Sequence, residues 1–298
     1  MPTIRKVRKV FKSKPTIEGA GVHLKRAFGR HHVPEFDPFL LLDDFHSARP
    51  EDYLAGFPWH PHRGIETITY VLEGTIEHGD SMGNTGVISS GDVQWMTAGS
   101  GIVHQEMPKG RADGRLWGFQ LWANLPAEDK MMEPRYRGIE ARDIPEVVFA
   151  EGGAAATDAR GNGGARVKVI CGEIEGVRGP VRDVVTDPEY IDVTLPAGAD
   201  FARRVHRGYT AFAYVIEGAG AFQPGGDPHD PESLVIFDDG DELAVTAGDA
   251  GVRFLLVSGR PIGEPIAWWG PIVMNTQEEL QLAFDEYDQG TFLKHGKT

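Results

Sequence analysis

The chain repeats two short landmarks at long range, and this repeat limits the folds that it can adopt. The run Tyr-Val-Leu-Glu-Gly at residues 70–74 returns as Tyr-Val-Ile-Glu-Gly at 214–218. A Gly-Asp pair followed by Thr-Ala-Gly occurs at 91–99 and again at 240–248. Because both landmarks recur in the same order, the sequence predicts two similar modules in one chain of 298 residues.

The two modules are expected to consist of short strands joined by turns. Residues 66–74 alternate apolar and polar side chains and end at a glycine, which is the pattern of a strand. Glycine and proline number 38 and 20 among the 298 residues, which favours many turns. Residues 151–165, dense in Gly and Ala, have the composition of a linker. We therefore place the domain boundary there, with domains 1–150 and 151–298.

Two helices are expected among these strands. Residues 126–134 can form a short helix, with Pro126 in its first turn. The clearer helix follows Asn275, with Thr276 and Glu279 as a capping box and Gly290 as its end. Its apolar positions recur at helical spacing, at Leu280, Ala283, Phe284 and Tyr287. We expect this helix to pack on a sheet; a helix that binds a partner is the alternative.

The charge balance and the single cysteine indicate an acidic protein of a reducing compartment. Acidic side chains outnumber basic ones by 44 to 30, so polyanions such as DNA should be repelled. The first thirty residues hold nine basic side chains and one acidic one. Within them, the run at 5–14 is short and interleaved with Val and Phe, and we interpret it as a charged edge strand rather than a nucleic-acid patch. Cys171 lies in a strand pattern and is expected to be a buried structural thiol. With no signal peptide and no long apolar run, we expect a cytoplasmic protein with no membrane partner.

Two triplets in the first module have the spacing of metal ligands. His60 and His62 precede one strand, and His104 and Glu106 follow another. Side chains at i and i+2 of a strand point to the same face, so two neighbouring strands can offer four ligands. Such ligands suit Fe(II), Mn, Ni, Cu or Zn, and two open octahedral positions favour dioxygen chemistry at iron. Glu66 is the alternative carboxylate, or it orients a ligand by hydrogen bonding.

The second module is expected to hold no metal. The repeat carries the four ligand positions onto Arg204, His206, Arg253 and Leu255, which include two guanidinium groups and one imidazole. Its role is then structural, or it supplies a wall or a partner surface. His206 is expected to be packed, with a separate catalytic base as the alternative. The remaining histidines, His78 among them, are isolated in the sequence and expected to be solvated. We find no motif of hydrolase or nucleotide chemistry.

The residues around these ligands resemble a known family. Residues 56–108, together with 116–136 and 266–280, are similar to the signature regions of the pirin family, a branch of the cupin superfamily. The resemblance implies an all-β fold of two jelly-roll (cupin) barrels in one chain, with a short C-terminal helix. It also implies iron bound in the N-terminal barrel by the residues matching His60, His62, His104 and Glu106, and no metal in the C-terminal barrel.

Some pirin-like proteins are quercetin 2,3-dioxygenases, and the resemblance implies this activity here. The flavonol 3-hydroxyl would lose its proton to Glu106 and bind the metal, and dioxygen would react beside it. The partners would be a small aromatic substrate and dioxygen. Trp95, Met96 and Met107 are candidates for apolar walls, with ordinary barrel core as the alternative. Trp59, a bulky side chain directly before the first ligand, can narrow the mouth of the site.

Two other kinds of function remain open on the sequence. Other pirins resemble iron-dependent redox regulators that bind a protein partner, a transcription factor or a metabolic enzyme. In that case the basic segment at 1–30 is the candidate surface. A cupin isomerase or small-molecule binder would keep the barrel without needing open metal positions.

Overall fold

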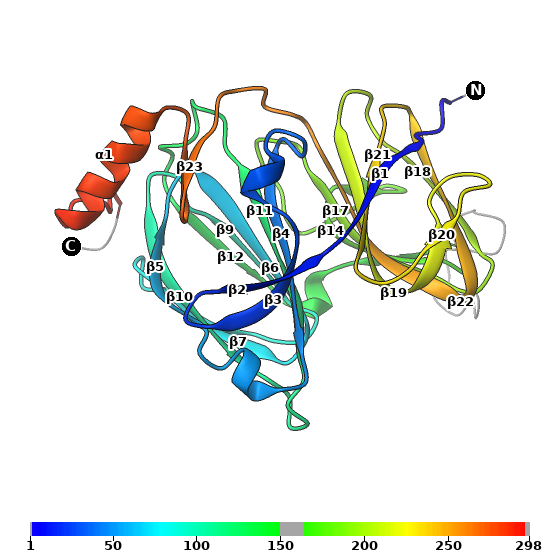
Figure 1. Cartoon of the computed structure of the whole chain (residues 1–298), viewed down its shortest axis with the longest axis horizontal. Coiled ribbons are helices and arrows are strands. Elements are labelled where there is room, and N and C mark those ends of the chain that lie inside the picture. Colours follow the sequence, from blue (N-terminus) through cyan, green and yellow to red (C-terminus); the bar gives the residue numbers. More distant parts are fainter. Residues whose placement is uncertain (1, 150–163, 296–298) are drawn as a thin grey trace. The chain divides into compact units, whose positions relative to one another are not determined.

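The chain folds into two compact units (Figure 1) in a computed structural model that describes residues 2–149 and 164–295. The unit that we call the first barrel consists of Lys14–Ala141 and Ile262–Thr298. The second barrel consists of Met1–Ser13 and Arg142–Pro261. Strand pairing within both units is antiparallel, apart from three isolated bridges. The two cupin barrels expected for this chain are therefore present.

The units differ from the domains 1–150 and 151–298 at both ends of the chain. The strand at Val7–Lys12 pairs with a strand of the second barrel, and residues 262–295 pack with the first. Backbone hydrogen bonding holds the N-terminal strand, and burial of apolar side chains such as Ile272 and Val273 holds the C-terminal segment. The expected linker lies almost entirely within residues 150–163, outside the described part of the chain.

The first barrel consists of two main sheets, and the chain passes between them several times. Their orders are β12-β9-β6-β11-β4-β3-β2 and β5-β10-β7-β8, and a hairpin β23–β24 and helix α1 complete the unit. The bounds are β2 Lys14–Glu18, β3 Val22–Phe28, β4 Phe39–Ser47, β5 Phe57–His62, β6 Ile65–Glu73, β7 Thr75–Asp80, β8 Thr85–Ile88, β9 Val93–Thr97, β10 Ile102–Lys109, β11 Leu116–Asn124, β12 Arg135–Ile139, β23 Ala267–Trp269, β24 Ile272–Met274 and α1 Gln277–Asp288, with 3-10 turns at Arg30–His32 and Pro50–Asp52.

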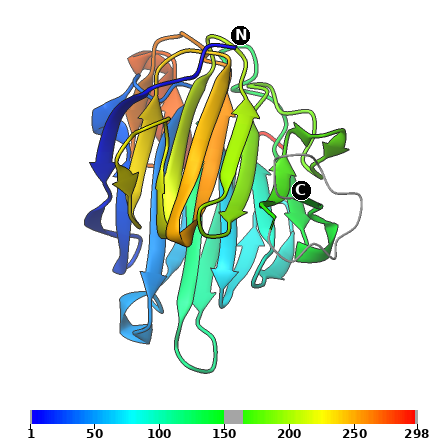
Figure 2. The ribbon, with the colours of Figure 1, turned by 90° about the vertical axis from the view of Figure 1, so that its right-hand side faces the viewer.

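The second barrel is built on one sheet in the order β1-β21-β19-β22-β17-β14-β13, with β18 paired to β22 and β20 to β19. Figure 2 looks onto strands of this sheet, with β22 in orange. The bounds are β1 Val7–Lys12, β13 Glu146–Val148, β14 Arg166–Cys171, β15 Glu173–Ile174, β16 Val177–Arg178, β17 Glu189–Leu195, β18 Asp200–Arg204, β19 Thr210–Ala221, β20 Pro228–His229, β21 Ser233–Phe237 and β22 Glu242–Gly259, and a 3-10 turn covers Ala141–Asp143.

The interiors of the two barrels differ in polarity. On β6, Thr67 and Thr69 are buried, and Thr69 lies opposite Gln94 of β9. On β19, the residues at the same place in the repeat are Ala211 and Ala213, both buried in an apolar core. At these two positions the first barrel therefore keeps polar side chains where the second has apolar ones.

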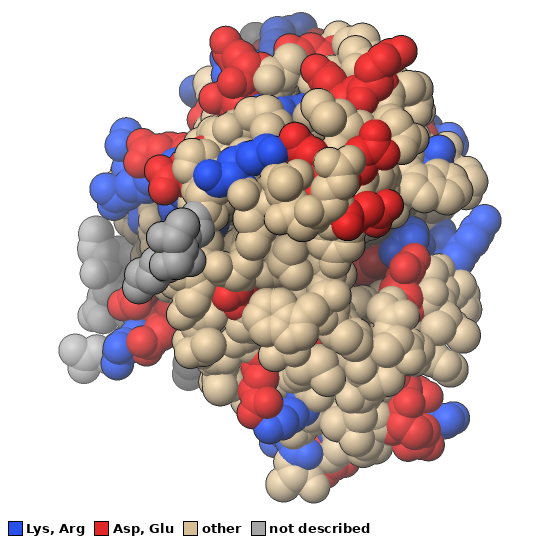
Figure 3. All heavy atoms as spheres, turned by 90° about the vertical axis from the view of Figure 1, so that its left-hand side faces the viewer, with Lys and Arg blue, Asp and Glu red and all other residues tan. Residues whose placement is uncertain are grey.

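Several local predictions can be compared with this fold. β6 confirms the strand expected at 66–74, and β1 confirms the charged edge strand, because it is the last strand of its sheet. Cys171 is buried, as expected. Figure 3 shows a face of the molecule on which acidic and basic groups surround an area of other residues, without a continuous basic surface. In the described residues, no helix is long and apolar enough to cross a membrane.

The two predicted helices have different outcomes. Helix α1 begins after Thr276, whose hydroxyl and Glu279 form the expected capping box, and Leu280 and Ala283 are buried. The helix expected at 126–134 is wrong, since the segment forms only turns. Its Lys130 ammonium is buried and donates to three oxygens of other segments, which holds the backbone in a non-helical path.

Candidate metal centre

Two neighbouring strands of the first barrel carry the predicted ligands. β5 and β10 lie side by side (Figure 1) and pair antiparallel. His60 lies opposite His104, and His62 opposite Ile102. His60 and His62 are two residues apart on one strand and point to the same face. The strand register thus brings three imidazoles to one side of the ladder.

The three imidazoles meet at their Nε2 atoms. The Nε2 of His60 lies 3.1 Å from that of His62 and 3.0 Å from that of His104. One nitrogen from each ring lies within 4.8 Å of the other two. Within residues 2–149 and 164–295, this is the only group of three or more His, Cys, Asp or Glu side chains with metal-binding geometry.

The hydrogen bonds of the other ring nitrogens determine which lone pairs face the centre. The Nδ1 atoms of His60 and His62 each lie 2.9 Å from a carbonyl oxygen, of Pro58 and Pro271 respectively. A carbonyl only accepts, so each Nδ1 carries the proton and each Nε2 is unprotonated. Two unprotonated nitrogens 3.1 Å apart cannot hydrogen-bond to each other, but they can bind the same cation. The three histidines therefore fit a metal ion.

Burial keeps these imidazoles neutral. It lowers the pKa of His60 and, together with the neighbouring imidazoles, lowers the pKa of His62 and His104 well below the usual 6.5. His62 and His104 are almost fully buried, whereas His60 is partly exposed. A metal ion needs neutral imidazoles, so the site is ready to bind one without first losing protons.

The fourth predicted ligand, Glu106, is not in this group. It follows His104 by two positions on β10, but the register with β5 shifts between the two residues. Its carboxylate is buried and accepts hydrogen bonds from the Thr69 hydroxyl, at 2.9 Å, and from the Gln120 amide, at 3.0 Å. Both oxygens are thus held by side chains of the neighbouring sheet.

Glu66, the alternative carboxylate, lies elsewhere. Its carboxylate accepts a hydrogen bond from the Thr97 hydroxyl at 2.6 Å, and it is not in the histidine group. Glu66 is four residues after His62 but does not share its strand, because the chain turns at Arg63 and Gly64 and continues as β6 in another sheet. Gly64 has a φ of +77°, and a side chain there would meet the Val273 carbonyl oxygen.

A cleft of about 560 Å³ opens onto His60 and His62. This volume is in the range of small-molecule sites. Its apolar walls include Phe57, Trp122 and Trp268, and the rings of the two tryptophans lie 6.0 Å apart. Gln120 also lines the cleft and therefore connects it to Glu106.

The walls expected from the sequence are not the ones observed. Trp95 and Met96 are buried core, Met107 packs near Gly56, and none of the three lines this cleft. Trp59 is 53% exposed and lies over Gly79 of β7, so it does not narrow the cleft. Successive residues of a strand face opposite sides, which separates Trp59 from His60.

The sequence reasoning missed the part played by the C-terminal hairpin. The Pro271 carbonyl orients His62, and Trp268 supplies a wall of the cleft. The buried Arg63 side chain ties the same segment to the site, with bonds to the Ser100 and Phe292 carbonyl oxygens and an ion pair with Glu286. The run Trp-Trp-Gly-Pro at 268–271 can be recognised in the sequence, but its closeness to the histidine group depends on the fold.

His78, expected to be solvated, is buried beside the centre. Its ring lies 5.6 Å from that of His104 and stacks on Tyr136, and its Nε2 lies 3.3 Å from Asp80. It stands opposite Glu106 in the pairing of β7 with β10. The alternation of Ile76, His78 and Asp80 along β7 was the signal that could have placed it on the inner face.

In the second barrel, the four positions that the repeat predicted as counterparts of the ligands do not all come together. Arg204 and His206 line one cleft, but Arg253 pairs with Asp192 outside it. The residue opposite Arg204 is Glu242, whereas the residue opposite His60 is His104. The landmark at 240–248 therefore leads into β22, whose first part corresponds to β10. The same landmark at 91–99 leads into β9 instead. His206 is exposed, so the expectation that it is packed is wrong.

Comparisons with known proteins agree with the fold. The pirin family profile matches residues 21–123, and that of the pirin C-terminal cupin domain matches residues 190–293. A pirin-like protein of Caulobacter vibrioides is 46% identical over 97% of this chain and 99% of its own length. A protein of Pseudomonas aeruginosa named "Putative quercetin 2,3-dioxygenase" is 41% identical over 97% and 99%.

A solved structure is also similar to this chain over nearly its whole length. The crystal structure of a quercetin 2,3-dioxygenase from Acinetobacter baumannii has a TM-score of 0.84 and 31% identity, over 97% of this chain and 99% of that one. Both barrels are covered by family matches, and full-length relatives exceed 40% identity. The chain belongs to the pirin family of the cupin superfamily.

Proposed function

We propose that the chain is a metal-dependent dioxygenase that opens a flavonol such as quercetin. The observation that carries the proposal is the group of three imidazoles, two of them with unprotonated Nε2 atoms, at a cleft with aromatic walls. The names of the relatives in Pseudomonas and Acinetobacter support the same activity. The single, buried cysteine suits a cytoplasmic location, which we also propose.

We propose His60, His62, His104 and Glu106 as the ligands, and Fe(II) as the metal. A bound Fe(II) would supply the redox chemistry with dioxygen that the side chains of the protein lack. Three neutral nitrogen donors and one carboxylate suit this ion, although Mn, Ni, Cu and Zn accept the same donors. Thr69 and Gln120 hold the two oxygens of the Glu106 carboxylate.

The side chains of the cleft have three tasks in this function. Trp122 and Trp268 bind a flat aromatic ring between apolar surfaces and exclude water from it. Gln120 fixes the carboxylate of Glu106 next to the cleft. Glu106 then accepts the proton of the flavonol 3-hydroxyl, which leaves the substrate as the anion that reacts.

Oxygen uptake tests this function. Protein loaded with Fe(II) under anaerobic conditions should consume oxygen when quercetin is added, and the flavonol absorption band should disappear at the same rate. His62→Ala should abolish metal binding and turnover together, because it removes a buried ligand. His23→Ala, at an exposed histidine outside the histidine group, is the matched control and should change neither. Turnover by His62→Ala protein without metal would contradict the proposal.

A further inference from the structure

A row of polar side chains crosses the larger sheet of the first barrel at one level. Arg26 of β3 lies opposite Asp43 of β4, and Asp43 lies opposite Gln120 of β11. Gln120 in turn lies opposite Thr69 of β6, and Thr69 lies opposite Gln94 of β9. Asp43, Thr69 and Gln94 are buried. Because burial of polar and charged groups costs free energy, packing alone does not favour such a row.

The second barrel has the same row without a polar side chain. Its strands β14, β17, β22, β19 and β21 are neighbours in the same order as β3, β4, β11, β6 and β9. The repeat aligns Thr69 with Ala213, and the strand register then gives the other counterparts. In strand order they are Val169, Ile191, Leu256, Ala213 and Val235, and all five belong to the apolar core. The fold therefore does not require polar groups in this row.

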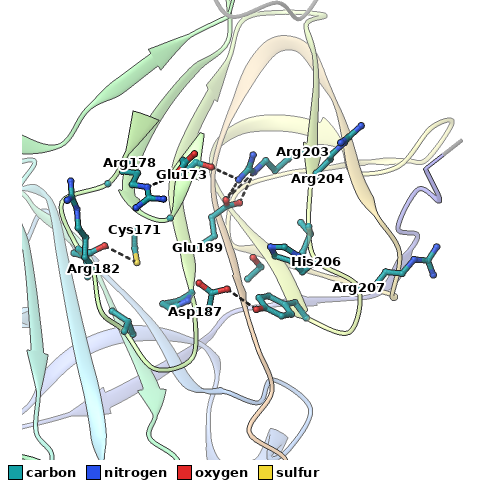
Figure 4. A pocket seen from close by; sticks show the side chains of 18 of the residues that line it. Cys171, Glu173, Arg178, Arg182, Asp187, Glu189, Arg203, Arg204, His206 and Arg207 are labelled. Carbon is teal, nitrogen blue, oxygen red and sulfur yellow. Dashed lines mark hydrogen bonds and ion pairs between the residues drawn. The ribbon is translucent and has the colours of Figure 1, made fainter. Parts of the chain in front are cut away.

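The row also differs between the barrels in what it faces. Figure 4 shows a cleft of the second barrel, and none of the five apolar counterparts lines it. Charged side chains of that cleft pair with one another, as Glu189 does with Arg203. In the first barrel, Arg26, Asp43 and Gln120 line the cleft beside the histidine group. The polar row thus occurs where the barrel has its candidate metal centre.

The wall of this cleft combines the polar row with an apolar one. Trp122 lies opposite Leu41, and each is two residues along its strand from Gln120 and Asp43 respectively. Residues two apart on a strand share a face and lie about 7 Å from each other. The ring of His62 lies 5.0 Å from that of Trp122. An aromatic compound that binds on Trp122 beside the histidines therefore extends towards Asp43.

Asp43 and Arg26 hold each other and keep further bonding capacity. Arg26 donates to the two oxygens of Asp43 at 2.8 and 2.7 Å, and to Glu18 at 2.8 Å. These bonds use three of its five N–H groups and one lone pair of each Asp43 oxygen. Burial raises the pKa of Asp43 to about 6, although Arg26 opposes this shift, so the group is mainly an anion at neutral pH. The wall thus presents hydrogen-bond acceptors and donors side by side.

The charges that line the cleft balance each other. Glu18 and Asp43 are acidic, Arg26 and Arg30 are basic, and Arg30 lies over the ring of Trp269 at 5.0 Å. An anion would be repelled by Asp43 and a cation by Arg26, so neither sign of charge is favoured. A neutral hydroxyl group can both donate and accept, which matches an acceptor beside a donor.

We propose that Asp43 and Arg26 select the substrate of the first barrel by binding the hydroxyl groups of a phenolic ring. A hydroxyl donates to the Asp43 carboxylate, and the same or a neighbouring hydroxyl accepts from Arg26. The substrate class is then a flavonol with hydroxyl groups beyond the one at position 3. This inference rests on the proposed function, because it concerns the same cleft.

Ligand binding to the metal-free, full-length protein tests this selection. The Kd is measured by fluorescence quenching for 3-hydroxyflavone, which has no further hydroxyl, for galangin, with two on the fused ring, and for quercetin, with two more on the outer ring. Quercetin should bind at least about tenfold more tightly than 3-hydroxyflavone, because its hydroxyls bond to charged groups. Galangin that binds as tightly as quercetin would place the fused ring at Asp43, and galangin that binds as weakly as 3-hydroxyflavone would place the outer ring there.

A double variant removes the selecting pair without leaving a charge unpaired. Arg26→Val with Asp43→Ile copies the counterparts in the second barrel, and it should abolish the preference for quercetin while 3-hydroxyflavone still binds. Asp43→Asn, which keeps the shape of the side chain, should reduce the preference. The matched control is Arg253→Val with Asp192→Ile, which removes a similarly buried pair with bonds at 3.0 and 2.7 Å. This control should leave the preference unchanged.

Unaltered Ni²⁺ binding shows that the double variant is folded, since neither residue belongs to the histidine group. Equal binding of quercetin and 3-hydroxyflavone by the wild-type protein, no binding of quercetin, or a full preference in the folded double variant would overturn the proposal. The assay involves neither metal nor oxygen. A preference that depends on Asp43 and Arg26 would therefore stand even if oxygen uptake contradicted the dioxygenase function.

Discussion

The number of protons released when the histidine group binds a metal ion can be predicted from its geometry. Burial holds the pKa of His62 and His104 well below 6.5 and also lowers the pKa of His60. At pH 6.5, three ordinary histidines would each be half protonated and would release about 1.5 protons in total. In this site the three imidazoles should release fewer protons than this, because their lowered pKa values leave more of them neutral.

Isothermal titration calorimetry measures this number directly. Ni²⁺ is titrated into metal-free protein at pH 6.5 in two buffers that differ in ionisation enthalpy, and the difference between the observed enthalpies gives the protons released. The same titration of an unstructured peptide with three histidines provides the reference. A release from the protein as large as that from the peptide would refute the inference that burial keeps these side chains neutral.

The same pKa shifts predict how the stability of the metal-free protein depends on pH. Below pH 6.5 the unfolded chain binds protons at these histidines, while the folded chain does not until the pH reaches their lowered pKa. Stability is therefore fully present above 6.5 and decreases as the pH falls, by up to about 1.4 kcal/mol per pH unit for each buried histidine. Urea unfolding of the metal-free protein at several pH values should show this decrease.

Three substitutions test other parts of the site. Arg63→Met should lower the free energy of unfolding by about 3–5 kcal/mol in urea, because it breaks a buried ion pair and leaves two buried carbonyl oxygens without a donor. Thr69→Val should weaken metal binding by about tenfold, because it removes a hydrogen bond that holds Glu106. Trp268→Leu should raise the Kd of a flavonol, measured by fluorescence quenching in metal-free protein, by about tenfold.

Each of these variants has a matched control. Arg49→Met removes an exposed arginine with surface ion pairs and should cost at most about 1 kcal/mol. Thr75→Val changes a threonine that bonds to a backbone carbonyl on the outer part of the barrel and should leave metal binding unchanged. Trp269→Leu changes a tryptophan that is 61% exposed and should have the smaller effect on flavonol binding. An equal effect of variant and control would contradict the role assigned in that pair.

Local sequence patterns predicted the features that depend on residues close together in the chain: helix α1, strand β6 and the three candidate histidine ligands. The capping box at Thr276 and the apolar spacing that follows it predicted α1, because the cap and the buried face are set within the helix. The alternation along 66–74 predicted β6, because the two faces of a strand are also set by neighbouring residues in the chain. His60, His62 and His104 could be selected because two-residue spacing on strands fixes the face to which side chains point.

Features that depend on pairing between distant strands were not predictable in this way. The helix expected at 126–134 failed because Lys130 bonds to backbone oxygens of segments 66 and 143 residues away. The burial of His78 depends on the pairing of β7 with β10. The position of Arg253 depends on β22, one continuous strand that pairs with β18 in its first part and with β17 in its second.

By itself, the sequence determined the repeat, the strands and the residue types that can bind a metal. Each of these depends only on which residue types occur at which spacing along the chain. Tertiary structure alone decided that the Pro271 carbonyl orients His62, that Trp268 rather than Trp95 lines the cleft, and that Glu106 is held by Thr69 and Gln120. These contacts join residues that are far apart in the chain. Their proximity results from sheet register and from the packing of the C-terminal hairpin, which no local pattern encodes.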